Sequence, residues 1–448
     1  MILPKSRTVL SLTCLTLLTA CGGKEKYLEP TGKAAFVPES TVEFSQYVHN
    51  SRKNIENILN EVRPNENKES YLGKYTNEEA AAMRSPFQVE SDRSQCNGMS
   101  KGNEKGFLLI HGLTDSPYLM SSISDSLAKE YPCSLIRAVL LPGHGTVVGD
   151  SLNMHNEDWK KIVQYGVDSF KHVDRVTDLY VAGFSTGTSL AIDYMQQNPS
   201  QRGTDRDDKI KGMILLSTAV KAKSKFACLS PLVSYVKDWM SVFHERDAAR
   251  YESFSYNAGA EFYDLTKDMA NPEYALDIPV LMAVSADDAT VDARAAREFF
   301  CYSKNVKRRA LIWYQSFYPE INAEINSKDT PELMCENIVE VRPKDLDPQY
   351  KTLNIAHTAI SIRPEDAHYG INGKYHNCKK YDSEKTMDQF YACQSNTSDY
   401  FFGEKNLEDS EGRYFRRGTF NPDYKNLEAR ILCFVNVNCP MNALLQVK

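Results

Sequence analysis

Short, continuously hydrophobic runs alternate along the middle of the chain with segments whose apolar residues recur at helical spacing. The hydrophobic runs cover residues 106–112, 133–145, 178–184, 210–217, 278–286 and 309–315. The helical segments between and after them cover residues 117–130, 155–173, 186–197 and 291–301. Strands that are hydrophobic on both sides belong to a parallel sheet covered by helices on both faces. The pattern therefore predicts an α/β fold.

The rest of the chain is predicted from longer segments that interrupt or flank this alternation. Residues 41–63 have near-helical apolar spacing and indicate a helix packed on the domain, whereas residues 64–104 are polar and irregular. The interval 218–277 is too long for a simple crossover and is rich in aromatic residues, so we interpret it as a cap over an active site. A subdomain with a small core of its own is the alternative. We interpret residues 316–352 as a second, polar insertion.

The C-terminal region and the overall composition fit one large domain. Residues 361–448 are rich in tyrosine and polar residues, with one apolar helix near 426–436. The chain has 448 residues, which suits a single α/β core over residues 41–448 with insertions. Its net charge is −6, and its lysines and arginines are scattered. We therefore expect no nucleic-acid partner.

The N-terminus has the pattern of an export signal. Two basic residues, Lys5 and Arg7, precede an apolar stretch over residues 9–20, which is followed by Cys21. The sequence "LTAC" at 18–21 resembles a bacterial lipobox, in which the cysteine is lipidated and becomes the mature N-terminus. We therefore predict a signal peptide over 1–20 and a lipid-anchored tether over 21–40; an ordinary signal peptide cut near residue 20 is the alternative. A glycine after the cysteine favours the outer membrane, by resemblance to known lipoproteins.

Export places the cysteines in an oxidising compartment. Of the eleven, Cys14 lies in the signal and Cys21 would carry lipid, which leaves nine. We expect up to four disulfides and one spare thiol; the closest pairs in sequence are Cys378 with Cys393 and Cys433 with Cys439. No cysteine or histidine cluster has the spacing of a metal site, so we expect no metal.

The candidate chemistry centres on "VAGFSTGTSL" (181–190), where a hydrophobic run stops at Ser185 between two glycines. A serine at a sharp strand-to-helix turn can be a nucleophile, whereas the simpler alternative is a turn residue that caps the helix. A serine nucleophile needs a histidine and a carboxylate, which in one class of α/β enzymes follow it in the order acid, histidine. The acid candidates are Asp287 and Asp288, directly after the run 278–286. The histidine candidates are His357, His368 and His376.

The oxyanion of such a reaction needs two hydrogen-bond donors, commonly backbone N–H groups. The sequence "IHGLTDSP" (110–117) follows a hydrophobic run and leads into a predicted helix. We expect the amide of Leu113 to supply one donor. The residue after the serine, Thr186, would supply the second.

Six motifs occur together in one order and resemble the α/β-hydrolase superfamily, in particular its carboxylesterase and monoacylglycerol-lipase or lysophospholipase-like branch. They are "LLIHGLTDSP", "LLPGHGT", "EDWKK", "VAGFSTGTSLA", "IPVLMAVSADDATVD" and "AHTAIS". The resemblance covers residues 105–300 well and the region of His357 by motif only. It implies an α/β-hydrolase fold with Ser185 as nucleophile, Asp288 as acid and His357 as base.

The resemblance also assigns supporting roles and shows two departures. It places His111 and His144 in loops that shape the site without taking the proton. Thr188 stands where the family often has glycine, and about forty residues separate the run 309–315 from His357.

We therefore expect an exported serine esterase that cleaves hydrophobic acyl esters through an acyl-enzyme, with no cofactor. Aromatic residues in the segment 218–277 favour a hydrophobic acyl group. A thioesterase, amidase or acyltransferase would use the same residues, because the pocket chooses the acyl acceptor. A non-catalytic envelope-binding lipoprotein is the alternative from another class.

Overall fold

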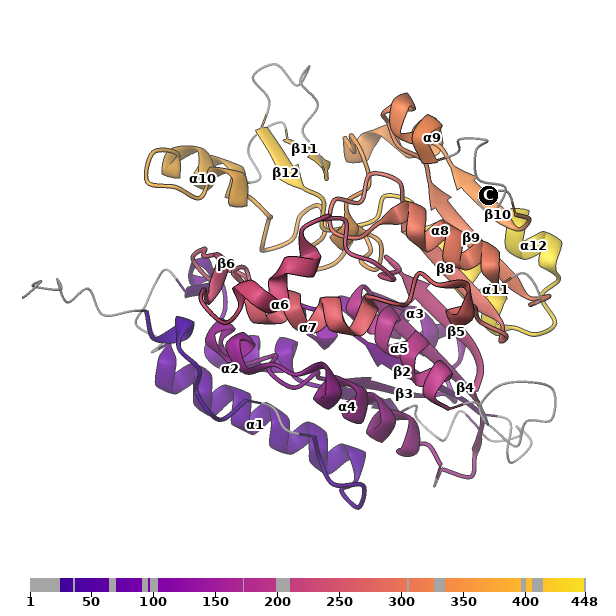
Figure 1. The fold of residues 1–448 in the computed structure, drawn as a ribbon, viewed down its shortest axis with the longest axis horizontal. Coiled ribbons are helices and arrows are strands. Elements are labelled where there is room, and N and C mark those ends of the chain that lie inside the picture. Colours follow the sequence, from indigo (N-terminus) through magenta and orange to yellow (C-terminus); the bar gives the residue numbers. More distant parts are fainter. Residues whose placement is uncertain are drawn as a thin grey trace, which may run out of the picture.

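The computed structural model describes residues 25–34, 37–63, 70–90, 96, 104–171, 173–198, 210–303, 306–325, 335–395, 400–404 and 414–446. Eight strands form its central sheet in the order β1-β3-β2-β4-β5-β8-β9-β10 (Figure 1). Their bounds are β1 Phe87–Glu90, β2 Glu104–Ile110, β3 Leu135–Val139, β4 Val176–Phe184, β5 Ile210–Leu216, β8 Val280–Ser285, β9 Arg309–Tyr314 and β10 Ile338–Val341. Neighbouring strands are parallel except β1 with β3. The predicted mostly parallel sheet is confirmed.

Helices cover both faces of this sheet, because alternate residues of each buried strand point to opposite sides. In β2, Leu108 and Ile110 belong to the core under α4 (Asn156–Asp168), α5 (Thr186–Gln197) and α8 (Ala293–Tyr302). Phe107 and Leu109 belong to the core under α3 (Ser121–Glu130), α11 (Tyr424–Val435) and α12 (Met441–Gln446). The helix predicted over 41–63 is α1 (Phe44–Val62), which packs on the first of these two cores. This is the predicted α/β-hydrolase architecture.

Two edges of the sheet differ from the prediction. The segment 64–104, expected to be irregular, contains α2 (Asn77–Arg84) and the antiparallel edge strand β1. The segment 316–352, expected to be a polar insertion, contains α9 (Pro319–Ile325) and the opposite edge strand β10. Both strands have only four residues and are largely half-buried, so neither leaves a continuous hydrophobic run in the sequence.

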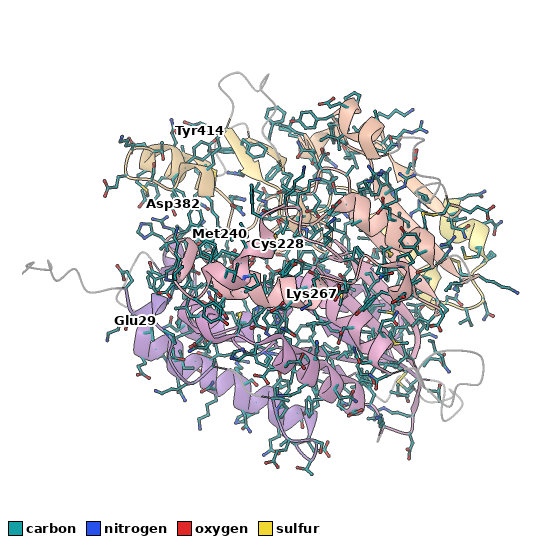
Figure 2. All side chains as sticks on the ribbon, in the orientation of Figure 1. Glu29, Cys228, Met240, Lys267, Asp382 and Tyr414 are labelled. Atoms are coloured by element: carbon teal, nitrogen blue, oxygen red, sulfur yellow. A yellow bond between two sulfur atoms is a disulfide. The ribbon has the colours of Figure 1, made fainter. Side chains whose placement is uncertain are left out.

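The interval between β5 and β8 holds, besides two short 3-10 helices, α6 (Ser230–Val233), β6 (Trp239–Ser241), β7 (Phe254–Ser255) and α7 (Tyr256–Thr266). Its second half is anchored, because Ala258 and Leu265 of α7 pack in the core of the domain. Its first half is exposed and carries many large apolar side chains at the surface. These are Phe226, Leu229, Leu232, Tyr235, Val236, Met240 and Val242. Met240 and Cys228 are labelled in Figure 2.

The C-terminal region returns over this segment. It contains α10 (Met387–Gln394) and the two-stranded pair of β11 (Tyr400–Gly403) with β12 (Tyr414–Arg417), drawn above α6 and α7 in Figure 1. Four disulfides are present: Cys96–Cys133, Cys301–Cys335, Cys378–Cys393 and Cys433–Cys439. The free cysteine of the described chain is the exposed Cys228. The sequence predicts up to four bridges and one spare thiol, and the two pairs that are closest in sequence, whose pairing it leaves open, are both bridged.

The N-terminal prediction lies mostly outside the described residues, including the signal over 1–20 and Cys21. Within the expected tether, Thr31 donates hydrogen bonds from its backbone N–H and its hydroxyl to the Asp150 carboxylate, at 2.7 and 2.9 Å. The tether segment contacts the domain already from Tyr27 and Leu28, which pack against its core. Across the described part of the chain, every helix is too short or too polar to cross a membrane.

Candidate active site

Ser185 lies at the turn between β4 and α5 in a backbone conformation that few residues other than glycine adopt, with φ 51° and ψ −121°. Its N–H donates to the carbonyl of Leu216 at 2.9 Å, which holds the turn against the next strand. Close packing explains the two glycines. A Cβ at Gly183 would lie 2.5 Å from the backbone of Gly187, and one at Gly187 would lie 2.2 Å from the carbonyl oxygen of Ile110.

The serine, histidine and aspartate side chains form a continuous hydrogen-bonded chain. His357 Nε2 lies 2.9 Å from Ser185 Oγ, and His357 Nδ1 lies 2.6 Å from Asp288 Oδ2. The side chains of His357 and Asp288 are 5% and 0% exposed, so water competes little for this contact. The other carboxylate oxygen of Asp288 accepts the N–H groups of Thr290 and Val291 at 2.8 and 2.9 Å, which fixes the rotamer.

The neighbouring carboxylate, Asp287, does not reach the histidine. It is fully buried and accepts a hydrogen bond from the Ser316 hydroxyl at the foot of α9. Adjacent residues in the turn after β8 thus face different parts of the molecule. Of the two acid candidates, the structure brings Asp288 to His357.

The other two histidine candidates also lie elsewhere. His368 is buried between Asp247, at 2.8 Å from its Nε2, and the Tyr75 hydroxyl, at 2.8 Å from its Nδ1. His376 is buried beside α10, where its backbone groups bond to the side chain of Gln394. Both histidines stabilise the C-terminal region.

The loop before His357 is held from several sides. The Ser217 hydroxyl donates to the His357 carbonyl at 2.7 Å, and the Ser285 hydroxyl donates to the Ile355 carbonyl at 2.8 Å. Ser217 and Ser285 come from the ends of β5 and β8. The long spacing before His357 is therefore taken up by α9 and β10, and the loop still returns to the strand ends.

The two predicted oxyanion donors line one cavity with Ser185 and His357. Among the hydrogen bonds of the described residues, none is donated by the amide of Leu113 or Thr186. Residues 111–113 follow β2, whose last residue Ile110 pairs with Gly183 of β4, so this loop and the serine turn are neighbours. Both amides are thus available to a ligand in the cavity.

Two buried histidines shape the loop that carries Leu113. His144 Nε2 bonds to the Leu113 carbonyl, and His111 Nδ1 lies 2.8 Å from the Gly112 carbonyl. His111 Nε2 accepts the N–H of Leu141 at 3.0 Å. Burial lowers the pKa of both rings, that of His111 well below 6.5. Both are therefore neutral at physiological pH and position the backbone without taking a proton.

The cavity has a volume of about 670 Å³, and its lining residues fall into an apolar set and a charged set, called below the apolar wall and the charged wall. One wall is apolar and comes mainly from the segment between β5 and β8: Phe226, Leu229, Val233, Met240, Phe243, Phe254 and Phe262. The other carries charged side chains that the sequence analysis did not single out: Asp115, Arg250, Glu252, Lys379 and Arg417. Over the described ranges, no group of three or more histidine, cysteine, aspartate or glutamate side chains is arranged to hold a metal ion.

Comparison with known proteins gives partial similarities. No family model matches the chain. A thermostable monoacylglycerol lipase of Bacillus sp. (strain H-257) is 27% identical over 193 residues, which are 42% of this chain and 71% of the lipase. This similarity confirms the resemblance that the sequence motifs indicated.

Two solved structures are also similar over about half of this chain. The Paleococcus ferrophilus monoacylglycerol lipase is 18% identical, with 51% of this chain and 88% of that one covered at a TM-score of 0.39. The Saccharomyces cerevisiae monoglyceride lipase is 13% identical, with coverages of 54% and 88% at a TM-score of 0.40.

Proposed function

We propose that this protein is a carboxylic ester hydrolase that uses Ser185, His357 and Asp288 as a catalytic triad on hydrophobic acyl esters. The observation that carries the proposal is the hydrogen-bonded chain from Ser185 Oγ through both ring nitrogens of His357 to Asp288. Similarity to a monoacylglycerol lipase supports the same reaction class.

In the first half of the proposed reaction, Ser185 Oγ attacks the ester carbonyl while His357 Nε2 takes its proton. Asp288 holds the Nδ1–H tautomer and stabilises the imidazolium that forms. The negative oxygen of the tetrahedral intermediate is bound by the amides of Leu113 and Thr186. His357 then protonates the leaving alcohol, and the acyl group stays on Ser185.

In the second half, a water molecule takes the place of the alcohol. His357 removes its proton, the hydroxide attacks the acyl-enzyme, and the carboxylic acid leaves as Ser185 is reprotonated. The acyl chain lies against the apolar wall between Phe226 and Phe262, which favours a hydrocarbon chain over a polar one.

Labelling with a fluorophosphonate, combined with hydrolysis of p-nitrophenyl esters of increasing chain length, tests this function. We expect labelling on Ser185, none in Ser185→Ala, and higher kcat/KM for medium chains than for acetate. A folded wild-type protein that neither labels nor hydrolyses any ester would contradict the proposal and favour a non-catalytic binding role.

We also propose that the protein is an exported lipoprotein, anchored through Cys21 at the outer membrane. Support comes from the lipobox-like "LTAC" at 18–21 and from the four disulfides, which are typical of an oxidising compartment. An anchor at the membrane would place the enzyme beside lipid esters.

A further inference from the structure

The charged wall of the active-site cavity has no part in the hydrolysis steps proposed above. Three of its members are cations, Arg250, Lys379 and Arg417, and they come from distant parts of the sequence. Charged side chains that line an otherwise apolar cavity are costly unless they are paired. We therefore followed the partners of each cation.

Arg250 is buried beside the oxyanion loop, with 9% of its side chain exposed. It donates to the Thr114 hydroxyl at 3.2 Å, directly after Leu113 in the sequence. Its Nε lies 3.7 Å from the Asp115 carboxylate, which is too long for a hydrogen bond. In the part of the chain that the structure describes, this buried Nε–H has no hydrogen-bond partner. A ligand cannot reach this buried atom, but Nη1 is not among the fully buried atoms and makes no hydrogen bond within the described residues, so the guanidinium keeps donor capacity there.

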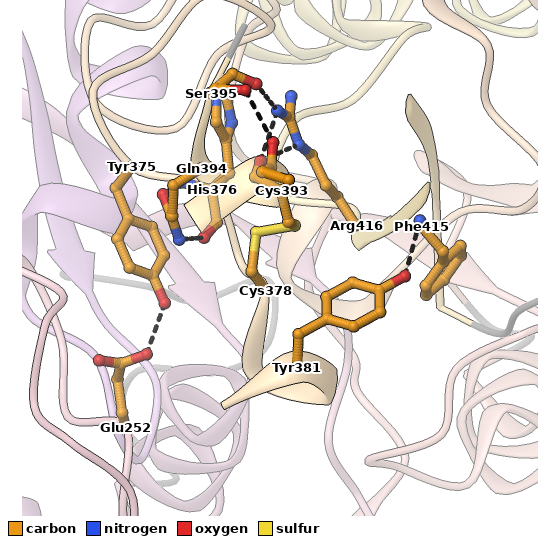
Figure 3. The surroundings of a disulfide bond; sticks show 11 residues. Glu252, Tyr375, His376, Cys378, Tyr381, Cys393, Gln394, Ser395, Phe415 and Arg416 are labelled. Atoms are coloured by element: carbon orange, nitrogen blue, oxygen red, sulfur yellow. Dashed lines mark hydrogen bonds between the residues drawn. A yellow bond between two sulfur atoms is a disulfide. The ribbon is translucent and has the colours of Figure 1, made fainter. Parts of the chain in front are cut away.

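Among the described residues, Lys379 has one hydrogen-bond partner and one cation–π contact, because its ammonium lies 5.1 Å from the centroid of the Phe243 ring. Its ammonium donates to the backbone carbonyl of Glu252 at 2.7 Å, and no carboxylate of the described residues lies within ion-pair distance. The Glu252 carboxylate instead accepts the N–H groups of Arg246 and Asp247 and the Tyr375 hydroxyl, the last of which is drawn in Figure 3. Two of the three ammonium donors of Lys379 are thus left for a ligand.

The electrostatic surroundings of Lys379 agree with this arrangement. Burial lowers the pKa of Lys379 to about 8, Glu252 and Glu245 oppose that effect, and Arg250 and Arg417 add to it. The two arginines are therefore close enough to repel the ammonium. A bound anion would relieve this repulsion.

Contacts within the C-terminal region fix the position of Lys379. The preceding residue, Cys378, is joined to Cys393 of α10, and Figure 3 shows this disulfide with its neighbours. The Arg416 guanidinium donates to the Cys393 carbonyl, and the Tyr381 hydroxyl accepts the N–H of Phe415 at 3.1 Å. Lys379 is thus held by a disulfide and a hydrogen-bonded scaffold.

Arg417 is already paired. It donates to Glu404 at 2.8 Å and to the Thr290 hydroxyl at 3.2 Å, and 28% of its side chain is exposed. It contributes positive potential at the cavity, whereas Arg250 and Lys379 have free donors.

We propose that Arg250 and Lys379 form an anion-binding subsite, and that the natural substrate is an ester of an apolar acyl chain with an alcohol that carries a phosphate or carboxylate. This deepens the proposed function and rests on it. Arg250 bonds to Thr114, the residue after the proposed oxyanion donor Leu113, so the anion would bind close to the ester group, and we assign the charge to the alcohol part. Hydrolysis consumes one water, releases the fatty acid, and returns the anionic alcohol protonated by His357.

Three octanoyl esters test this specificity: 1-octanoylglycerol, 1-octanoylglycerol 3-phosphate and octanoyloxyacetate. We expect the better of the two anionic esters to have a kcat/KM at least about tenfold above the neutral one, as one or two charge-assisted hydrogen bonds provide. The phosphate and carboxylate arms identify the anion. In Lys379→Met this ratio should fall about tenfold, and in Lys379→Arg it should be largely kept.

Lys380 offers a matched control, because it is the neighbouring lysine and is exposed. Lys380→Met should keep the wild-type ratio. Equal kcat/KM for neutral and anionic esters in the wild-type protein would overturn the subsite. The subsite would also be overturned if Lys379→Met and Lys380→Met changed the ratio of kcat/KM for anionic and neutral esters by the same factor.

A binding measurement separates failure of the subsite from failure of the esterase proposal. In Ser185→Ala, calorimetric titration should show octyl phosphate binding at least about tenfold more tightly than the neutral 1-O-octylglycerol, and the added Lys379→Met substitution should remove the difference. Equal binding of both probes would overturn the subsite even if the wild-type protein hydrolyses esters. Absence of any Ser185-dependent hydrolysis, with octyl phosphate still preferred, would overturn the esterase alone.

Discussion

The Glu404 carboxylate accepts a hydrogen bond from the backbone N–H of His357 at 2.9 Å. Glu404 follows β11, and its side chain is 4% exposed and paired with Arg417. The loop that carries His357 is therefore held by the C-terminal region through Glu404 and by the strand ends through Ser217 and Ser285.

Loss of this contact should misplace the imidazole. We expect Glu404→Ala to lower kcat by up to about 100-fold, as small displacements of reacting groups do, with a smaller change in KM. Glu404→Gln keeps an acceptor for the N–H of His357 and should recover most of the activity. Steady-state kinetics on one p-nitrophenyl ester decide the matter, and equal kcat in both variants and the wild type would contradict a positioning role.

The triad residues should act as one unit. Ser185→Ala and His357→Ala should each lower kcat by several orders of magnitude, and Asp288→Asn by about 10³- to 10⁴-fold, because an amide favours the wrong histidine tautomer. The Asp287 carboxylate bonds to Ser316 and not to His357, so Asp287→Asn should retain most activity. If Asp287→Asn instead lost far more activity than Asp288→Asn, the catalytic acid would be Asp287. His368→Ala and His376→Ala, if folded, should stay within a few-fold of wild type.

The tight packing at the serine turn predicts a stability difference between two glycines. Gly187→Ala would place Cβ 2.2 Å from a backbone oxygen, so we expect a loss of more than about 2 kcal/mol in the free energy of unfolding. At Gly259 in α7 the new Cβ meets only side-chain atoms, from 3.3 Å outward, and a helical alanine is favoured by about 1 kcal/mol. Urea unfolding measures both; a Gly187→Ala protein as stable as Gly259→Ala would contradict the packing argument.

The buried histidines predict a pH dependence of stability. Because burial lowers the pKa of His111 and His144 in the folded protein, the unfolded chain takes up protons near 6.5 that the folded protein does not. Stability from these residues is therefore complete above pH 7.5 and falls as the pH drops below 6.5, by at most about 1.4 kcal/mol per pH unit for each ring. Urea unfolding from pH 7.5 to 5.5 measures the slope.

A variant pair isolates this effect from other titrating groups. His144→Gln cannot take up a proton and should have a shallower slope than the wild type. His49 is exposed, so His49→Gln should keep the wild-type slope. Identical slopes in all three proteins would contradict neutral buried histidines.

The mature N-terminus should be a lipidated Cys21. Mass spectrometry of the N-terminal peptide from the native host should show diacylglyceryl and acyl additions on this cysteine, and Cys21→Ala should release the protein from membranes. An unmodified amine on Cys21 or on a neighbouring residue would contradict the lipoprotein proposal.

The sequence predicted those parts of the molecule that lie next to long hydrophobic runs. Ser185 directly follows β4 and Asp288 comes three residues after β8, so each is tied to a strand whose buried position is evident from composition. The helix α2 was missed, although Thr76 and Glu79 form a capping box that marks its start. The edge strands β1 and β10 were missed because four half-buried residues carry little periodic signal.

The charged wall could not be predicted from the sequence. Lys379 and Arg417 of this wall, and Glu404 beside His357, lie in polar, tyrosine-rich sequence, where a buried charge and an exposed one have the same local pattern. Their roles depend on contacts made far along the chain, such as that of Lys379 with Glu252. Only the folded arrangement shows that this region reaches the cavity.

The reacting residues and Lys379 of the proposed anion-binding subsite are encoded by separate stretches of the gene. Ser185, Asp288 and Leu113 follow strands of the sheet, whereas Lys379 and Arg417 belong to the C-terminal region that α10, β11 and β12 build. Substitutions at Lys379 would change which class of ester is preferred and leave Ser185, His357 and Asp288 in place, whereas Glu404 of the same region must be kept because it holds the His357 loop. After a gene duplication, the two copies of the enzyme would then differ in their preferred ester and keep the same hydrolytic reaction.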